Sequence, residues 1–148
     1  MLLKKLIGIK SFYLFSLLSI SFSANAFTIH GLGGRCLDVL GYLTANNAPV
    51  QIYDCHGDIN QNWEINNGQI VGIGGKCLDA LYGNSATGTL VVTSDCRGIA
   101  SQKWVLKDGN IIGIGGKCLE VLGGFNIKST PVVLGECHGG ANQKWWFQ

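Results

Sequence analysis

The stretch VQIYDCHGDINQNW, residues 50–63, decides the fold because it recurs twice further along the chain. It returns as VVTSDCRGIASQKW at 91–104 and as VVLGECHGGANQKW at 132–145, with cysteine, glycine, glutamine and tryptophan in the same places. The copies align at a constant offset without a gap. Repetition at a fixed period, here about 41 residues, indicates one structural unit used several times. We therefore expect three equivalent repeats, at about 27–68, 69–109 and 110–148.

The segment 1–26 differs from the repeats and has the features of a signal peptide. Lys4, Lys5 and Lys10 precede an apolar run at 12–20, and the small residues Ala-Asn-Ala at 24–26 form a cleavage signature. A membrane anchor is the alternative, but this run is shorter than a span, which needs about 20 apolar residues, and it is interrupted by serines. We expect removal of the segment 1–26, which leaves 27–148 without a membrane span, in a secreted or periplasmic protein.

Charge and hydrophobic pattern exclude several classes of protein. Without the three leader lysines, the chain keeps 8 basic and 9 acidic residues, so its formal charge changes from +2 to −1. This charge is not typical of proteins that bind nucleic acid or anionic lipid. Segments such as GRCLDVL and APVQIYDC carry strand-forming residues and are separated by stretches rich in glycine and asparagine. Because no segment shows a sustained helical period, an all-β fold is predicted.

The number and likeness of the repeats favour a closed threefold arrangement. Propellers use four to eight blades, and solenoids usually have atypical polar end repeats, whereas here the end repeats resemble the middle one. Three repeats that each contain a C-L-[DE] segment and a final Q-x-W resemble the ricin B-type β-trefoil lectin family. The resemblance covers nearly all of 27–148. It implies a β-trefoil with pseudo-threefold symmetry, in which each repeat supplies four short strands and has a position that can carry one sugar site.

Each repeat contains two cysteines, and their spacing is the same in all three. Six cysteines permit 15 pairings, and the pairing that follows the repeat is the simplest. It joins Cys36 to Cys55, Cys77 to Cys96 and Cys118 to Cys137. Metal binding is the alternative, suggested by His56 and His138 beside cysteines, but there is no C-x-x-C and the second repeat has Arg97 at this position. Disulfides are therefore predicted, and neither a metal nor a cofactor is expected.

The first repeat has a distinct set of polar and aromatic residues around its cysteines. If its two strands run antiparallel with Cys36 opposite Cys55, then Asp38 faces Tyr53, and Gln51 lies on the same side of the hairpin. A carboxylate, an aromatic ring and an amide then converge. A pyranose has an apolar face that can lie on an aromatic ring, and hydroxyls that need fixed acceptors and donors. This set therefore predicts a sugar site.

The family resemblance assigns the same residues to sugar binding. Family sites use an aspartate after the first cysteine, an aromatic residue two before the second, and the asparagine of N-Q-x-W. The carbohydrate-binding residues implied here are Asp38, Gln51, Tyr53, Asn60 and Gln61, with Tyr53 as the platform and Gln61 mainly structural. The sugars implied are galactose and N-acetylgalactosamine.

The other two repeats depart from this pattern. The second keeps Asp79 but has Ser94 in place of the aromatic residue and Ser101 in place of the asparagine, so no site is expected there. The third has Gly135 in place of the aromatic residue. It is expected to form at most a weak site, from Glu120, Asn142 and Gln143.

The tryptophans of the three repeats do not vary with the site residues. Because Trp63, Trp104 and Trp145 recur in repeats that differ at the site, they are predicted to belong to the structural core rather than to bind ligand.

These patterns together predict a non-enzymatic carbohydrate-binding protein that recognises galactose- or N-acetylgalactosamine-type glycans mainly through its first repeat. The three histidines share no position common to all repeats, and no nucleophile–base motif is present. Paired carboxylates for glycoside hydrolysis stay open, although Asp38 and Asp54 recur as repeat features. The alternative is a non-catalytic interaction protein on the same scaffold, such as an inhibitor or the delivery subunit of a toxin, with a separate toxin or enzyme chain as its partner.

Overall fold

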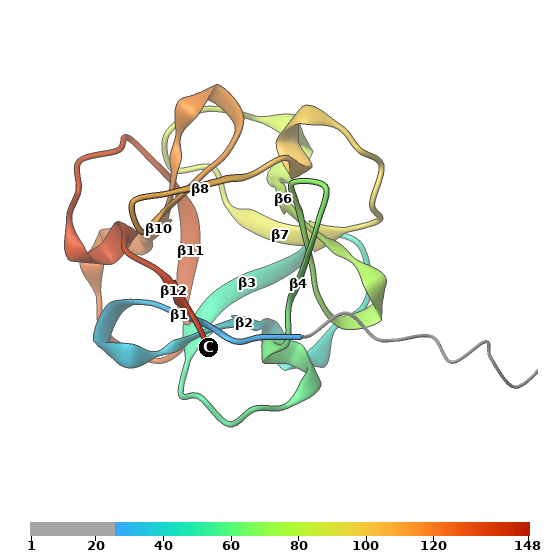
Figure 1. Cartoon of the computed structure of the whole chain (residues 1–148), viewed down its shortest axis with the longest axis horizontal. Coiled ribbons are helices and arrows are strands. Elements are labelled where there is room, and N and C mark those ends of the chain that lie inside the picture. Colours follow the sequence, from blue (N-terminus) through green and yellow to red (C-terminus); the bar gives the residue numbers. More distant parts are fainter. Residues whose placement is uncertain (1–25) are drawn as a thin grey trace, which may run out of the picture.

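A computed structural model describes residues 26–148, so residues 1–25 of the predicted signal peptide lie outside the described part. The described chain forms twelve short β-strands joined by turns and single 3₁₀ turns (Figure 1). The first repeat contains β1 (Ile29–His30), β2 (Cys36–Val39), β3 (Ala48–Tyr53) and β4 (Glu64–Asn66). The second contains β5 (Gln69–Val71), β6 (Cys77–Ala80), β7 (Val91–Ser94) and β8 (Val105–Lys107). The third contains β9 (Asn110–Ile112), β10 (Cys118–Val121), β11 (Thr130–Gly135) and β12 (Trp146–Phe147).

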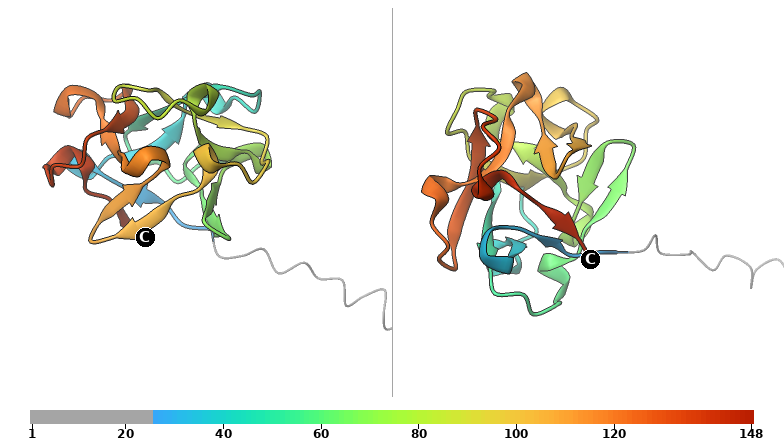
Figure 2. Two further views of the ribbon diagram at one scale, coloured as in Figure 1. Left: turned by 90° about the horizontal axis from the view of Figure 1, so that it is seen from above. Right: turned by 60° about the vertical axis from the view of Figure 1, so that its left-hand side comes forward.

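The long strand of each repeat meets those of the other two around a common axis. β3 pairs with β7 through Ala48 and Thr93 and with β11 through Ile52 and Thr130, and a bridge from Leu90 to Val133 completes the circle. The hairpins β4–β5 and β8–β9, together with the pair β12–β1, lie at one end of the molecule (Figure 2). This arrangement confirms the predicted all-β trefoil with four strands in each repeat.

The three repeated tryptophans lie in the core, as predicted. Trp63 is fully buried, and Trp104 and Trp145 are nearly so. Each indole Nε1 donates a hydrogen bond to the carbonyl of the leucine that follows the first cysteine of its repeat, at 3.0–3.1 Å. The indole therefore packs in an apolar interior while its single polar group is satisfied.

A glycine of the adjacent repeat makes room for each tryptophan. A Cβ at Gly72 would lie 2.7 Å from the Trp63 ring, and a Cβ at Gly113 would lie 2.5 Å from the Trp104 ring. Gly31 of the first repeat has the same relation to Trp145 of the third, at 2.5 Å. The same contact thus links the first repeat to the second, the second to the third, and the third back to the first.

Three disulfides join the cysteines within the repeats, in the pairing that follows the repeat, with Cα–Cα distances of 5.1–5.2 Å. The predicted strand register is wrong by two residues. Cys36 lies opposite Tyr53, and Asp38 lies opposite Gln51 rather than Tyr53. The chain leaves β3 after Tyr53, so Cys55 reaches Cys36 from beyond the end of the strand. A shift by an even number keeps every side chain on its predicted face, which preserves the convergence of Asp38, Gln51 and Tyr53.

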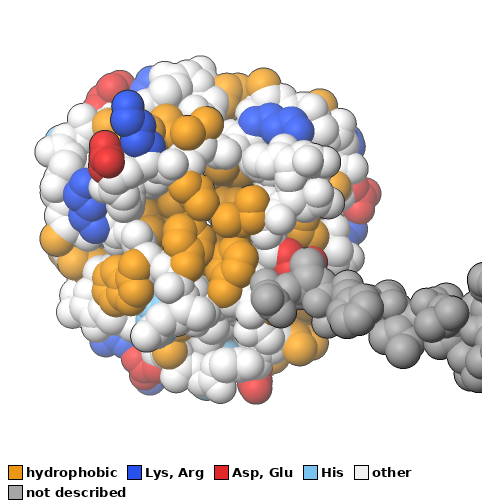
Figure 3. Space-filling model, in the orientation of Figure 1, with side chains coloured by type: hydrophobic (Ala, Val, Ile, Leu, Met, Phe, Trp, Pro, Cys, Tyr) orange, Lys and Arg blue, Asp and Glu red, His pale blue; other side chains and the backbone are white. Residues whose placement is uncertain are grey.

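Hydrophobic side chains gather at the centre of the face drawn in Figure 3. The hairpin strands at this end carry Ile65, Leu106 and Phe147 at equivalent positions, and their side chains are 37–43% exposed. Among the described residues no helix is long and apolar enough to cross a membrane.

Candidate functional site

The first repeat contains a cavity of about 450 Å³. Four of the five residues predicted to bind ligand line it: Asp38 from β2, Gln51 and Tyr53 from β3, and Asn60 from the 3₁₀ turn η4 (Ile59–Gln61). Tyr42, His56 and Ser129 also line it and were not predicted. Ser129 belongs to the third repeat, so the wall of the cavity is shared between two repeats.

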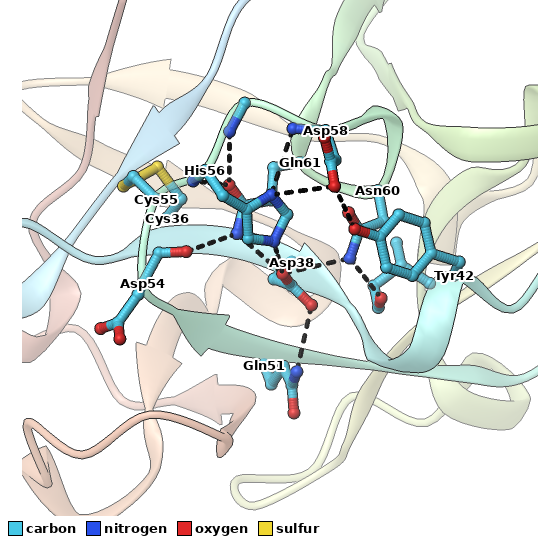
Figure 4. Close-up of polar contacts among 12 residues, drawn as sticks. Cys36, Asp38, Tyr42, Gln51, Asp54, Cys55, His56, Asp58, Asn60 and Gln61 are labelled. Atoms are coloured by element: carbon cyan, nitrogen blue, oxygen red, sulfur yellow. Dashed lines mark hydrogen bonds and ion pairs between the residues drawn. A yellow bond between two sulfur atoms is a disulfide. The ribbon is translucent and has the colours of Figure 1, made fainter.

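Asp38 is the polar centre of this cavity. Its side chain is almost fully buried, and three amide groups donate hydrogen bonds to its carboxylate (Figure 4). Gln51 Nε2 lies 3.0 Å from Oδ1, while Asn60 Nδ2 and Gln61 Nε2 lie 3.2 Å and 2.8 Å from Oδ2. A buried carboxylate needs such partners because its desolvation is costly. The amides therefore hold the acceptor oxygens of Asp38 in a fixed orientation.

Gln61 lies behind Asp38 and is fully buried, so it supports the site without lining the cavity. Its Oε1 accepts the backbone N–H of His56 at 2.9 Å, and its Nε2 also donates to the carbonyl of Asp54 at 2.9 Å. Gln102 and Gln143 make the same bonds in the other repeats. This glutamine fastens the loop after the second cysteine to the strand that carries the acidic residue, which is a structural task.

Tyr53 ends β3 with a half-buried side chain at the cavity. The His56 ring meets it at an interplanar angle of 65°, with ring centroids 6.1 Å apart. Lys128 of the third repeat places its ammonium group 5.8 Å from the centre of the Tyr53 ring. The aromatic surface predicted as a platform is thus present beside the carboxylate.

His56 lies between the two tyrosines and faces Asp38. Its Nδ1 accepts the backbone N–H of Asp58 at 3.1 Å, and its Nε2 lies 3.6 Å from Asp38 Oδ2. His138 has the same arrangement in the third repeat, with its Nε2 3.0 Å from Glu120. Arg97 takes this position in the second repeat. The residue after the second cysteine therefore places a basic side chain beside the carboxylate in each repeat.

Tyr42 forms a side of the cavity that was not predicted from the sequence. It ends the 3₁₀ turn η3 (Leu40–Tyr42) in a left-handed backbone conformation with φ of 60°. Its hydroxyl donates a hydrogen bond to the Asp58 carboxylate, and this bond is the main cause that raises the pKa of Tyr42 above its usual value. The corresponding residues of the other repeats are Gly83 and Gly124. An aromatic residue where its counterparts are glycines was the signal in the sequence.

The second repeat lacks two of the three amide donors that surround Asp38 in the first. Val92 takes the place of Gln51, and Asp79 keeps one amide donor, Gln102, at 3.0 Å. Asp79 Oδ1 and Ser101 Oγ are buried without a hydrogen-bond partner among residues 26–148. The residues that replace the aromatic ring and the asparagine are both small, so this repeat retains the carboxylate without the rest of the site.

The third repeat brings its predicted residues together but has no aromatic platform. Glu120 accepts a hydrogen bond from Gln143 at 3.0 Å, and Asn142 donates to the carbonyl of Val121 at 3.2 Å. A Cβ at Gly135 would lie 2.6 Å from the Glu120 carboxyl group. The longer acidic side chain thus occupies the space beside the strand where Tyr53 stands in the first repeat.

One group of potential metal ligands lies near the site. His30 Nδ1 is 3.6–3.7 Å from the sulfurs of Cys36 and Cys55. Metal coordination by cysteine requires thiolates, and these sulfurs are joined in a disulfide. The contact is therefore a packing contact.

Comparison with known proteins places this geometry in a family. Residues 25–145 match the ricin-type beta-trefoil lectin domain. No curated protein sequence matches the chain.

Solved structures with the same fold include a designed threefold-symmetric protein, ThreeFoil (27% identity, TM-score 0.76, covering 82% of this chain and 96% of that one). The C-half of an earthworm R-type lectin in complex with GalNAc is similar at 20% identity and TM-score 0.73, covering 83% and 97%. A non-toxic homologue of type II RIPs from bitter gourd, in complex with α-methyl-D-galactoside, is similar at 25% identity and TM-score 0.74, covering 83% and 47%.

Proposed function

The chain belongs to the ricin-type β-trefoil lectin domain family, and we propose that it binds glycans of the galactose or N-acetylgalactosamine type through the cavity of its first repeat. The observation that carries this proposal is that a buried carboxylate, held by three amides, and the half-buried ring of Tyr53 line one cavity. Solved relatives described with GalNAc and with α-methyl-D-galactoside support the class of sugar.

In this proposal each side chain of the cavity has a role. The apolar C–H face of a pyranose lies against Tyr53, and its hydroxyls donate to the lone pairs that Asp38 has left after its amide bonds. Asn60 donates from its side-chain amide to Asp38 Oδ2 and to the carbonyl of Val39, and so helps to hold the carboxylate in place. Gln51 keeps the carboxylate facing the cavity. The first repeat therefore supplies both the apolar and the polar contacts that a sugar requires.

The proposed function is binding of a sugar without chemical conversion, and it gives no residue of the site a catalytic role. Asp38 is engaged by three amides and carries no role as an acid or base in this proposal, and the cysteines are joined in disulfides. The three disulfides support export to an oxidising compartment, either the cell exterior or a periplasm. In two structural neighbours, a mosquitocidal holotoxin and an exo-β-1,3-galactanase, the match covers 17% and 30% of a longer chain. A toxin or enzyme, here as a separate chain, is therefore the partner class to test after glycans.

The direct test is a glycan array with the purified protein, followed by titration of Tyr53→Ala with the sugar that binds best. Losing some tens of Å² of ring contact at about 25 cal/mol per Å² removes roughly 1 kcal/mol or more, so binding should weaken about tenfold. The melting temperature should change little, because Tyr53 is at the end of a strand and half-exposed.

Ser94→Ala in the second repeat is the matched control and should leave binding unchanged.

Titration of the wild-type protein should give one sugar per monomer, with poor agglutination of cells because agglutination needs two sites. Wild-type affinity in Tyr53→Ala across the array, or no bound glycan at all, would refute the proposal.

A further inference from the structure

Two tyrosines line the cavity, and they are not parallel. The Tyr42 ring stacks on His56 at an interplanar angle of 14°, whereas the Tyr53 ring is inclined to His56 by 65°. The Tyr42 ring is nearly parallel to the His56 ring, whereas the Tyr53 ring is steeply inclined to it. The two tyrosine rings are therefore steeply inclined to each other. One flat pyranose cannot lie face-on against both rings. Each ring offers its surface to a different part of a ligand.

The Tyr42 ring is held in place rather than free to turn away. Its hydroxyl donates to Asp58, and its face lies against His56 with ring centroids 6.3 Å apart. The backbone of Asp58 in turn donates to His56 Nδ1, so the three residues form one connected unit. The Tyr42 side chain is nevertheless 45% exposed. A fixed, accessible aromatic surface at the edge of a cavity is a preorganised contact for a ligand.

The backbone at Tyr42 is unfavourable for a side chain of this size. A non-glycine residue at φ of 60° is uncommon, and bulky residues seldom adopt it. The equivalent Gly83 and Gly124 have φ of 68° and 66°, so the turn itself requires only glycine. The tyrosine therefore adds strain to this turn.

We propose that Tyr42 contacts the second sugar unit of a glycan whose terminal unit lies on Tyr53. The ligand class is then a galactose-terminated disaccharide or a longer chain rather than a single sugar. The polar groups are distributed in a way that fits a terminal sugar unit at Tyr53 and a second unit at Tyr42. Asp38, Gln51 and Asn60 supply fixed hydrogen bonds next to Tyr53, whereas Asp58 on the Tyr42 side is engaged by the Tyr42 hydroxyl. The inference rests on the proposed function and names the ligand of the same cavity.

The test compares methyl galactoside with β1-3-, β1-4- and β1-6-linked galactose-terminated disaccharides by titration. At least one linkage should bind the wild-type protein about fivefold more tightly than the monosaccharide, a gain typical of one added aromatic contact. In Tyr42→Gly this ratio should fall to about one. Tyr42→Phe keeps the ring without the hydroxyl and should retain the ratio.

Tyr82→Gly is the matched control for the backbone. Tyr82 has φ of 57° in the equivalent turn of the second repeat and is 86% exposed, away from the cavity. Its replacement relieves similar backbone strain and should leave both affinities unchanged.

Three results would overturn the inference and leave the proposed function intact, and a fourth would overturn both. Equal affinity for the monosaccharide and every disaccharide would overturn the inference alone, and so would a ratio that survives Tyr42→Gly. Loss of the ratio in Tyr42→Phe would show that the ring alone does not provide the contact, which also overturns the inference. No binding of any of these sugars by the wild-type protein would overturn the proposed function and the inference together.

Discussion

The first and second repeats share a scaffold and differ in what they place on it. Both have an intra-repeat disulfide, a buried glutamine that accepts a backbone N–H and donates to an aspartate, and a core tryptophan bonded to a leucine carbonyl. Only in the first do Gln51, Tyr53 and Asn60 surround the carboxylate. The second has Val92, Ser94 and Ser101 at these positions.

The difference shows which residues belong to the fold and which to the site. Asp79 is kept in a repeat without an aromatic platform, where Gln102 and Arg97 contact it. An aspartate at this position therefore makes contacts with the loop after the second cysteine even where no ligand is expected. Aspartate alone does not indicate binding, whereas its combination with Gln51, Tyr53 and Asn60 does.

The largest effect is expected from removing the shared core. Trp63→Ala should lower the free energy of unfolding by about 3–5 kcal/mol, because a fully buried indole leaves a cavity that the surroundings fill only in part. Trp104→Ala should cost a similar amount. Urea denaturation measures both. Trp146→Ala is the control, since this tryptophan is 45% exposed, and its loss should be much smaller. Equal losses for Trp63 and Trp146 would contradict the assignment.

A smaller loss is expected where one repeat meets the next. Gly72→Ala places a methyl group 2.7 Å from the Trp63 ring, and overpacking of this kind costs about 1–3 kcal/mol. The backbone conformation is not the cause, because φ of −119° is open to any residue. The same change in a Trp63→Phe background should cost less, since the smaller ring leaves space; additive losses in this double-mutant cycle would argue against the contact.

The comparison of the two repeats can be tested directly by placing the site residues of the first repeat in the second. Val92→Gln, Ser94→Tyr and Ser101→Asn together give the second repeat the residues that surround Asp38, and the new amides can satisfy Asp79 Oδ1, which has no hydrogen-bond partner among residues 26–148. Titration should then show two sugars per monomer, the second within about tenfold of the first in affinity, or about 1.4 kcal/mol. Ser94→Tyr alone should leave one site. A triple variant that still binds one sugar would mean that these three residues are insufficient.

The smallest effect is expected at an exposed ion pair of the second repeat. A hydrogen bond from Lys76, followed by one from Asn46, lowers the pKa of Asp95 below its usual value. A carboxyl group whose pKa is lowered by folding adds stability above its unfolded pKa, and this contribution disappears as pH falls through the folded value. Asp95→Asn should therefore slightly lower the melting temperature at neutral pH and have no effect in strong acid. A difference between the two proteins that persists unchanged in strong acid would exclude this ion pair as the cause.

The fold could be predicted from the sequence because its determinants repeat. Trp63, Trp104 and Trp145 recur at one spacing. The tryptophan is kept in all three repeats although the site residues around it differ, which indicated that it belongs to the core. The strand register was harder. Alternation of side chains determines which face a residue occupies but not which residue stands opposite it, so Asp38 was placed across from Tyr53 instead of Gln51.

The unpredicted part of the site depends on turns and on contacts between repeats. Tyr42 lines the cavity from a turn in which its backbone takes a positive φ, and hydrophobic periodicity does not indicate such a turn. His56 was considered as a metal ligand, and its orientation toward Asp38 follows from a hydrogen bond to the backbone of Asp58. Ser129 is distant in sequence and belongs to another repeat, so no local pattern could have placed it at this wall.

Because β1 pairs with β12, the two ends of the described chain lie side by side. The chain could therefore start at a different repeat while the repeats keep the same cyclic order. Thr28 and Gln148 exchange backbone hydrogen bonds at 2.7 and 3.0 Å, so these two segments close a hairpin like the one that turns at Asn67 and Gly68. A circularly permuted chain, joined from Gln148 to Phe27 by a short linker and opened between Asn67 and Gly68, would keep every strand pair described above. Synthesis would then begin with the second repeat and end with the first.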